Sequence, residues 1–165
     1  MKKLLIHLGM GGHTSQVLRL VELMENKESK NKYNYEYLIG LDDQTSVQKI
    51  KYFGSVHKVK NPRLMTDKSV LKVFLKMFPT TLQVFKLLRK IKPNVIISAG
   101  PSLTIPLFWI AKLLGIKTIF VESWVRVHHG SQAGRFCYPV SDLFLVQWPT
   151  MKKVYPKAIY AGRLS

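Results

Sequence analysis

Cysteine is almost absent from this sequence of 165 residues. The one thiol, Cys137, allows no disulfide within the chain, which suits a reducing compartment. A lone cysteine carries no metal-binding signature, and the adjacent His128 and His129 have no Cys or third His close by in the sequence. We therefore predict no bound metal ion.

Acidic side chains are scarce as well. The chain has 9 Asp and Glu against 26 Lys and Arg, which gives a net charge of +17 at pH 7. The shortage is greatest after residue 60, where 16 basic side chains stand against 3 acidic ones. Such a charge attracts anionic partners: nucleic acid, an anionic membrane or a phosphorylated substrate. A solvated surface that only aids solubility is the alternative.

Long apolar runs are also missing. The opening run "LLIHL" is too short for a signal peptide and ends at glycines. The longest later stretch, 102–116, contains Pro106 and Lys112 and falls short of the roughly 20 residues of a membrane-spanning helix. No repeat, low-complexity segment or linker divides the chain. We predict one domain, 1–165, that is soluble or peripheral to a membrane and lies in the cytoplasm.

What the chain does have is an alternation of strands and helices. Runs rich in Val, Ile, Phe and Tyr, bounded by turn residues, predict strands at 3–8, 33–40, 55–60, 94–100, 117–123, 142–148 and 158–162. Helical periodicity lies at 13–27, 43–53, 69–91 and 104–114, and more weakly at 130–138 and 150–155. This order predicts an α/β fold, a Rossmann-like parallel sheet with flanking helices. Ligands of such sheets gather at the carboxyl ends of the strands.

The segment 67–93 is basic and amphipathic, and we expect Pro79 to break it into two helices. Basic amphipathic helices with aromatic side chains are typical of membrane-surface binding. Packing of the apolar faces on the sheet is the alternative. Five side chains of the first half are the candidates for a membrane surface: Lys68, Lys72, Phe74, Lys76 and Phe78.

The stretch "GMGGHT" follows the first predicted strand and opens a helix. Backbone N–H groups and the helix dipole make such a loop a natural anion site. It matches neither the dinucleotide pattern G-x-G-x-x-G nor a P-loop, and we predict no cofactor. Gly9, Gly11, Gly12 and Thr14 are candidate phosphate-binding residues, and His13 is a candidate base. A turn without a ligand is the alternative.

Two later strand ends carry further candidates. The turn "AGPS" contains Gly100 and Ser102, which either meet a ligand or only set and cap the next helix. The stretch "ESWVR" contains Glu122, Ser123 and Arg126. Glu122 is a candidate base or a group that orients a sugar hydroxyl, with an ion-pair hub as the alternative.

Five motifs occur in order along nearly the whole chain: "GMGGHT", "SAGPSLTIP", "FVESWVRV", "SQAGRFCYPVSDLFLVQWP" and "AIYAGRL". Together they resemble the Alg-fourteen/PssD family of oligosaccharide and exopolysaccharide biosynthesis proteins. That family is similar to the amino-terminal half of GT-B glycosyltransferases such as MurG. The resemblance therefore implies a single N-terminal-type GT-B lobe. It also implies a separate small partner of the PssE or Alg-thirteen type, which supplies the UDP-sugar site.

The function implied by the resemblance is that of the acceptor-binding subunit of a two-chain glycosyltransferase, inactive without its partner. The complex would transfer a hexose from a UDP-sugar to a polyprenyl-diphosphate-linked acceptor at the cytoplasmic face of a membrane. The loop Gly9–Thr14 would hold the acceptor diphosphate, His13 or Glu122 would meet the reacting hydroxyl, and Arg126 would offset negative charge. Partner docking is implied at the C-terminal end, at Tyr160, Gly162 and Leu164.

Eukaryotic members of the family carry a membrane-spanning segment before the first strand. Here the first strand starts at residue 3, so we expect 67–93 to make the membrane contact. Two other classes compete. A nucleic-acid-binding module is favoured by charge alone, because aromatic residues are not interleaved with the basic runs. A stand-alone nucleotide-dependent enzyme would need a second domain and a dinucleotide fingerprint.

Overall fold

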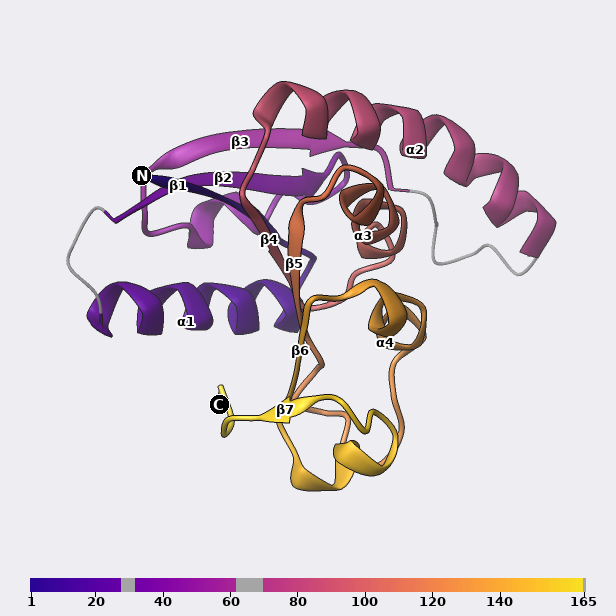
Figure 1. The fold of residues 1–165 in the computed structure, drawn as a ribbon. Coiled ribbons are helices and arrows are strands. Elements are labelled where there is room, and N and C mark those ends of the chain that lie inside the picture. Colours follow the sequence, from indigo (N-terminus) through magenta and orange to yellow (C-terminus); the bar gives the residue numbers. More distant parts are fainter. Residues whose placement is uncertain (28–31, 62–69, 165) are drawn as a thin grey trace.

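A seven-stranded parallel sheet forms the centre of the protein, in the order β3-β2-β1-β4-β5-β6-β7 (Figure 1). The computed structural model describes residues 1–27, 32–61 and 70–164, without the side chains of 27 and 70–77. Every neighbouring pair of strands is parallel. The strands are β1 (Lys2–His7), β2 (Tyr33–Gly40), β3 (Gly54–Val59), β4 (Val95–Ser98), β5 (Lys117–Val121), β6 (Leu143–Val146) and β7 (Ile159–Tyr160).

Helices cover both faces of the sheet. The α-helices are α1 (Gly12–Lys27), α2 (Val70–Ile91), α3 (Thr104–Leu113) and α4 (Gln132–Cys137). The described residues also form three short 3-10 helices: η1 (Val47–Lys49) between β2 and β3, η2 (Tyr138–Val140) after α4, and η3 (Pro149–Lys153) between β6 and β7. In Figure 1, α1 lies on one side of the sheet, and α2, α3 and α4 lie on the other. The predicted Rossmann-like parallel α/β fold is confirmed.

Two apolar clusters hold these layers together. On the side of α2, α3 and α4, the Phe120 ring stacks on Phe144 with 4.7 Å between ring centroids and meets Phe108 edge-on. On the side of α1, Val17 and Val21 pack with the buried tyrosines of β2. The central strands read as nearly continuous apolar runs because both of their faces are buried.

Three expectations about the helices are wrong. Pro79 lies inside α2, which is one continuous helix. A proline costs a helix one backbone hydrogen bond, but Val84 and Leu88 bury one face of α2 in the core, and Thr80 Oγ1 donates to the carbonyl of Lys60 at 3.2 Å. These tertiary contacts maintain the helix across the proline.

The segment 43–53 forms only the single 3-10 turn η1 instead of a helix. Asp43 Oδ1 accepts hydrogen bonds from the N–H groups of Thr45 and Ser46, at 3.1 and 3.0 Å. Side chains of this kind compete with the helix for backbone donors, which accounts for the difference. The weak helical segment 150–155 is likewise the 3-10 helix η3.

Among the described residues, no helix has both the length and the apolar character needed to cross a bilayer.

Candidate functional site

A cleft of about 600 Å³ opens at the carboxyl ends of β1, β2 and β4. Strand β1 has β2 on one side and β4 on the other, so the strand order reverses at β1. Such a reversal point is the usual position of a ligand in sheets of this kind. Three of the predicted residues, Gly9, His13 and Ser102, meet in it. The described lining residues are His7, Leu8, Gly9, Met10, His13, Gly40, Asp42, Asp43, Asn61, Pro101 and Ser102.

The three glycines of the first loop have different roles. A Cβ on Gly9 would lie 2.6 Å from the Pro101 ring, so this glycine lets the β1–α1 and β4–α3 loops touch. Gly11 has a φ of 70°, a left-handed conformation that favours glycine. Gly12 begins α1, and nothing lies within 4 Å of the place where its Cβ would be. Only at Gly12 is there neither backbone strain nor crowding by the protein itself.

Thr14 supports the loop from inside. It is fully buried, and both its N–H and its Oγ1 donate to the carbonyl of Gly9. Its Oγ1 is also hydrogen-bonded to Ser46 Oγ at 2.6 Å. The hydroxyl is therefore committed within the protein, and we do not retain it as a phosphate contact.

His13 lies at the cleft with a defined orientation. Its Nδ1 is 2.7 Å from the carbonyl oxygen of Ala99. A carbonyl only accepts hydrogen bonds, so Nδ1 carries the proton, and in the neutral ring Nε2 keeps its lone pair. That tautomer is the one that a general base requires.

A second histidine, His7, lies at the floor of the cleft and is missed by the sequence analysis. It is 1% exposed, and its Nδ1 lies 3.0 Å from Ser98 Oγ and 3.1 Å from Thr104 Oγ1. Burial, together with the nearby His13, lowers the pKa of His7 to about 3, so the ring is neutral at physiological pH. Its position, directly before the glycine loop at the end of a buried strand, was the available signal.

Carboxylates from the β2 end form another part of the cleft and were also missed. Asp42 is exposed and accepts a hydrogen bond from Asn61 Nδ2. Asp43 is buried and accepts from Ser46 Oγ at 2.5 Å, in addition to the two backbone bonds given above. Burial raises the pKa of Asp43, but the hydrogen bonds from Ser46 and Thr45 outweigh it and hold the pKa below its usual value.

Glu122 does not line the cleft. Its carboxylate is 1% exposed and lies between β5 and α4, where Oε1 accepts from the N–H of Ser123 at 2.9 Å. Oε2 accepts from the N–H and Oγ of Ser131 and from Tyr155 Oη, each at 3.1 Å. These four hydrogen bonds make Glu122 the hub of its loop, as in the structural alternative, but no cation among the described residues forms an ion pair with it.

Three further candidates from the loops, Gly100, Ser123 and Arg126, do not line the cleft either. Gly100 has a φ of 90° and packs against Phe120, which suits a tight turn. Ser123 is buried, and its carbonyl accepts from the N–H of Arg126, whose side chain is exposed. Within the described chain, no group of three or more His, Cys, Asp or Glu side chains is arranged to hold a metal ion.

The C-terminal tail lies against the end of the sheet. Tyr160, in the edge strand β7, is exposed, and Gly162 has a φ of 96°. The N–H of Leu164 donates to Gln147 Oε1 at 2.9 Å, and the Arg163 guanidinium stacks 4.8 Å from the centre of the Trp148 ring.

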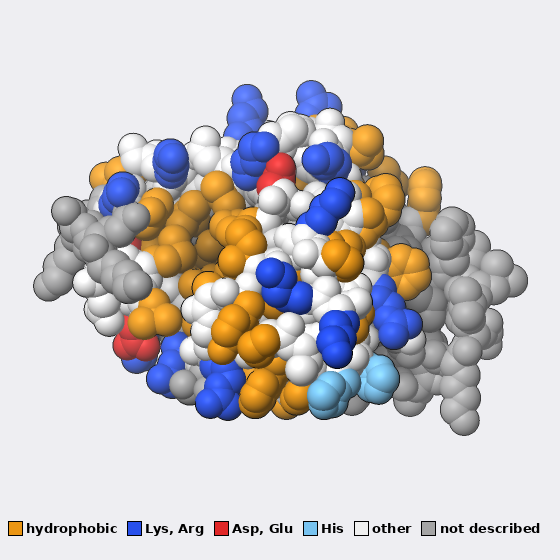
Figure 2. All heavy atoms as spheres, turned by 60° about the horizontal axis from the view of Figure 1, so that its bottom comes forward, with side chains coloured by type: hydrophobic (Ala, Val, Ile, Leu, Met, Phe, Trp, Pro, Cys, Tyr) orange, Lys and Arg blue, Asp and Glu red, His pale blue; other side chains and the backbone are white. Residues whose placement is uncertain are grey.

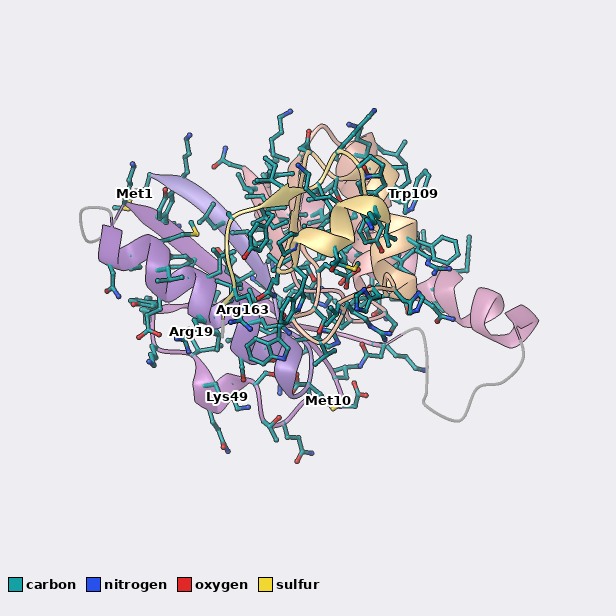
Figure 3. The ribbon with its side chains drawn as sticks, turned by 90° about the horizontal axis from the view of Figure 1, so that it is seen from below. Met1, Met10, Arg19, Lys49, Trp109 and Arg163 are labelled. Carbon is teal, nitrogen blue, oxygen red and sulfur yellow. The ribbon has the colours of Figure 1, made fainter. Side chains whose placement is uncertain are left out.

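A basic groove lies beside this tail. Arg19, Lys49 and Trp124 line it, and Trp148 Nε1 donates to the carbonyl of Trp124. Figure 3 shows Arg19, Lys49 and Arg163 on one side of the molecule, with Trp109 far from them. In Figure 2, Lys and Arg side chains are spread among apolar ones on this face and acidic ones are sparse.

Of the predicted membrane residues, Phe78 alone has a described side chain, which is 69% exposed. Lys68 lies outside the described residues, as do the side chains of Lys72, Phe74 and Lys76. The structure adds neighbours that the sequence analysis missed, because they come from other elements. The exposed apolar side chains on α2, α3 and α4, helices that pack on one another in that order, are named here the apolar patch: Phe78, Leu82, Phe85, Trp109, Leu113 and Phe136.

Comparison with known proteins gives a family. A family model described as "Oligosaccharide biosynthesis protein Alg14 like" matches residues 4–164. The mouse protein named "UDP-N-acetylglucosamine transferase subunit ALG14" is 33% identical over 183 residues, covering 98% of this chain and 82% of the mouse protein. The Schizosaccharomyces pombe protein of the same name is 31% identical over 176 residues, with the same two coverages.

Solved structures share the fold. MurG of Acinetobacter baumannii superposes with a TM-score of 0.70 at 15% identity, over 90% of this chain and 42% of MurG. UDP-GlcNAc 2-epimerase of Neisseria meningitidis superposes with a TM-score of 0.68 at 15% identity, over 98% of this chain and 46% of the epimerase. The chain thus spans less than half of either enzyme, and its fold is that of the N-terminal-type lobe of MurG-like GT-B proteins.

The pH dependence of stability tests the hydrogen bonds that hold the Asp43 carboxylate. Its folded pKa lies below the ordinary value of 3.8, so its charge stabilises the fold above that pH, and the stabilisation is lost as pH falls through the folded pKa. Asp43→Asn should lower the free energy of unfolding by about 1–3 kcal/mol at pH 7. The loss should shrink near pH 3. Urea unfolding at both pH values measures it, with the exposed Asp42→Asn as control; an equal loss at pH 7 and pH 3 would contradict the assignment.

Proposed function

Because the chain belongs to the family of Alg14-like oligosaccharide biosynthesis proteins, we propose that it is the acceptor-binding subunit of a two-chain glycosyltransferase. The complex transfers N-acetylglucosamine from UDP-N-acetylglucosamine to a polyprenyl-diphosphate-linked acceptor at the cytoplasmic face of a membrane. The donor follows from the names of the curated relatives. The observation that carries the acceptor role is the cleft with His13 at the start of α1.

The need for a partner rests on size. The chain superposes on 42% of MurG, and one Rossmann-like lobe does not enclose two reactants. We therefore assign the UDP-sugar site to a second, small chain of the PssE or Alg-thirteen type. The acceptor cleft would face that chain.

The chemistry follows from the orientation of His13. An acceptor hydroxyl oxygen forms a bond to the anomeric carbon of the donor sugar, the bond from that carbon to the diphosphate breaks, and UDP leaves. The hydroxyl proton goes to His13 Nε2, whose lone pair is set by the bond from Nδ1 to Ala99. Glu122 has no part in this step, because its carboxylate is buried in another loop.

The acceptor diphosphate is assigned to the start of α1. The first N–H groups of a helix have no partner within it and favour anions together with the dipole. Gly11 and Gly12 are exposed there, and the open space at Gly12 admits a phosphate close to the backbone.

The function is tested with the chain and its partner purified separately and combined. The chain alone should transfer no sugar, and the pair should transfer N-acetylglucosamine from UDP-N-acetylglucosamine to a lipid-linked acceptor. Gly12→Val should fold normally and raise the acceptor KM about tenfold or more while leaving the donor KM unchanged. His13→Ala should lower kcat by roughly 100-fold, the usual contribution of a general base.

A matched glycine pair controls for backbone strain. Gly11 and Gly115 have φ values of 70° and 68°, and a Cβ added at either position would have no other atom within 4 Å. Alanine at either site costs about the same stability, but only Gly11→Ala should weaken acceptor use. Full activity of the chain alone, or a normal acceptor KM in folded Gly12→Val, would overturn the assignment.

Membrane contact is assigned to the apolar patch of α2, α3 and α4. The same helices carry the exposed cations Lys86, Arg89 and Lys112, and the Arg89 guanidinium lies 5.6 Å from the centre of the Phe85 ring. A basic surface with exposed apolar side chains suits an anionic bilayer. Within it, Trp109 Nε1 donates to the carbonyl of Phe136 at 3.2 Å.

Vesicle sedimentation tests this surface. The double variant Phe78→Ser, Leu113→Ser should bind anionic vesicles at least tenfold more weakly, since each side chain adds on the order of 1.5–3 kcal/mol when fully buried in apolar surroundings. Binding of the unchanged chain should fall with added salt. Phe53→Ser, which changes a fully exposed phenylalanine between η1 and β3, is the control. Undiminished binding of the double variant would place the membrane contact elsewhere.

Partner docking is assigned to the C-terminal tail and the basic groove beside it. The tail is held by Gln147 and Trp148 but keeps Tyr160 and Arg163 exposed. The cations of the groove favour an acidic partner surface there.

Co-purification tests the docking assignment. Deletion of 160–165 should abolish recovery of the partner, and Arg163→Glu should weaken it at least tenfold while leaving β7 in place. Lys157→Glu makes the same charge change at an exposed site just before β7 and should have little effect. Normal recovery with both tail variants would rule out this surface.

A further inference from the structure

His7 has one ring nitrogen, Nε2, that no described residue hydrogen-bonds. Nδ1 contacts the hydroxyls of Ser98 and Thr104, which are also hydrogen-bonded to each other at 2.8 Å. Nε2 has no hydrogen-bond partner among the described residues. Every fully buried side-chain nitrogen or oxygen of these residues does have a partner, so Nε2 is not fully buried. Since His7 lines the cleft, Nε2 is open to it.

Neither tautomer of His7 is imposed by its surroundings. A hydroxyl both donates and accepts, so Ser98 and Thr104 satisfy Nδ1 whether or not it carries the proton. Nε2 can therefore present either an N–H or a lone pair to the cleft. His13 differs, because the carbonyl of Ala99 allows only one arrangement.

The surroundings of Nε2 suit a hydroxyl better than a phosphate. Asp42 and Asp43 line the same cleft, and none of its described lining residues is a Lys or Arg. Carboxylates repel a nearby phosphate but accept hydrogen bonds from sugar hydroxyls. His7 is neutral, because burial disfavours its charged form.

We propose that His7 is a substrate-positioning residue whose Nε2 hydrogen-bonds one hydroxyl of the acceptor sugar, at the floor of the cleft beneath His13. The proposal rests on the proposed function and deepens it. The sugar lies in the part of the cleft bounded by His7 and the two carboxylates, and the diphosphate lies outward at Gly11 and Gly12. A buried polar group that pairs with a substrate hydroxyl discriminates strongly against analogues that lack it.

Two substitutions separate the two ring nitrogens. In His7→Asn the short amide can keep the bonds to Ser98 and Thr104 but does not reach the position of Nε2. In His7→Gln the longer side chain reaches that position with an amide that donates or accepts. The pair thus tests the cleft contact separately from the buried one.

The experiment measures kcat/KM of the reconstituted pair with the parent acceptor and with a series of analogues, each lacking one hydroxyl of the acceptor sugar. We expect His7→Asn to lose at least tenfold with the parent acceptor, mainly through acceptor KM, and His7→Gln to recover most of the loss. With one analogue, kcat/KM of the unchanged enzyme should fall by about the same factor, whereas kcat/KM of His7→Asn should not fall any further. That coupling is a readout that a purely structural role would not produce.

The outcomes are distinct. If every analogue costs His7→Asn as much as it costs the unchanged enzyme, or if His7→Asn acts normally, the role of His7 is overturned. If the unchanged pair transfers no sugar to any acceptor, the proposed function falls, and this proposal with it. Should His7→Asn fail to fold by circular dichroism, His7→Phe fills the space, leaves Ser98 and Thr104 bonded to each other, and is carried through the same series.

Discussion

The adjacency of β1 and β4 is the constraint on which the rest of the site depends. His7 and Ser98 are register partners at the ends of these strands, and beyond them the chain turns away on opposite sides. The two loops stay in contact because Gly9 has no side chain to hold Pro101 away. That contact brings Ala99 to His13 and Ser98 to His7, so one strand pairing orients both histidines of the cleft.

Charge is distributed unevenly over the molecule, and the cleft differs in charge from the rest of the surface. The chain carries a large positive excess, yet the described part of the cleft has two carboxylates and two histidines. Exposed cations lie on the helices of the apolar patch and along the groove next to the tail. In the proposed function, long-range attraction to anions and close recognition of a sugar therefore fall to different surfaces.

The sequence predicted the strands and their parallel arrangement well, because apolar runs and glycine turns are local signals. It failed where tertiary contacts decide. Pro79 remains in a helix because the core retains the helix on either side of it, and Glu122 turned away from the cleft toward Ser131 and Tyr155.

His7 and Asp43 escaped notice for a related reason. A histidine inside "LLIHL" reads as part of a strand, and its open nitrogen is defined by Ser98 and Thr104, about ninety residues further along the chain. Asp43 lies in a segment whose periodicity suggested a helix, and the hydrogen bonds that stop the helix are visible only in three dimensions.

The shortness of β7 limits how another protein can attach at that end of the sheet. With only two residues, Ile159 and Tyr160, it presents very few unpaired backbone groups along the open edge. Short edge strands protect a sheet from extension by a foreign strand and so from edge-to-edge aggregation. A protein that binds at this edge must therefore recognise side chains rather than continue the sheet, and recognition by side chains makes the choice of partner depend on sequence.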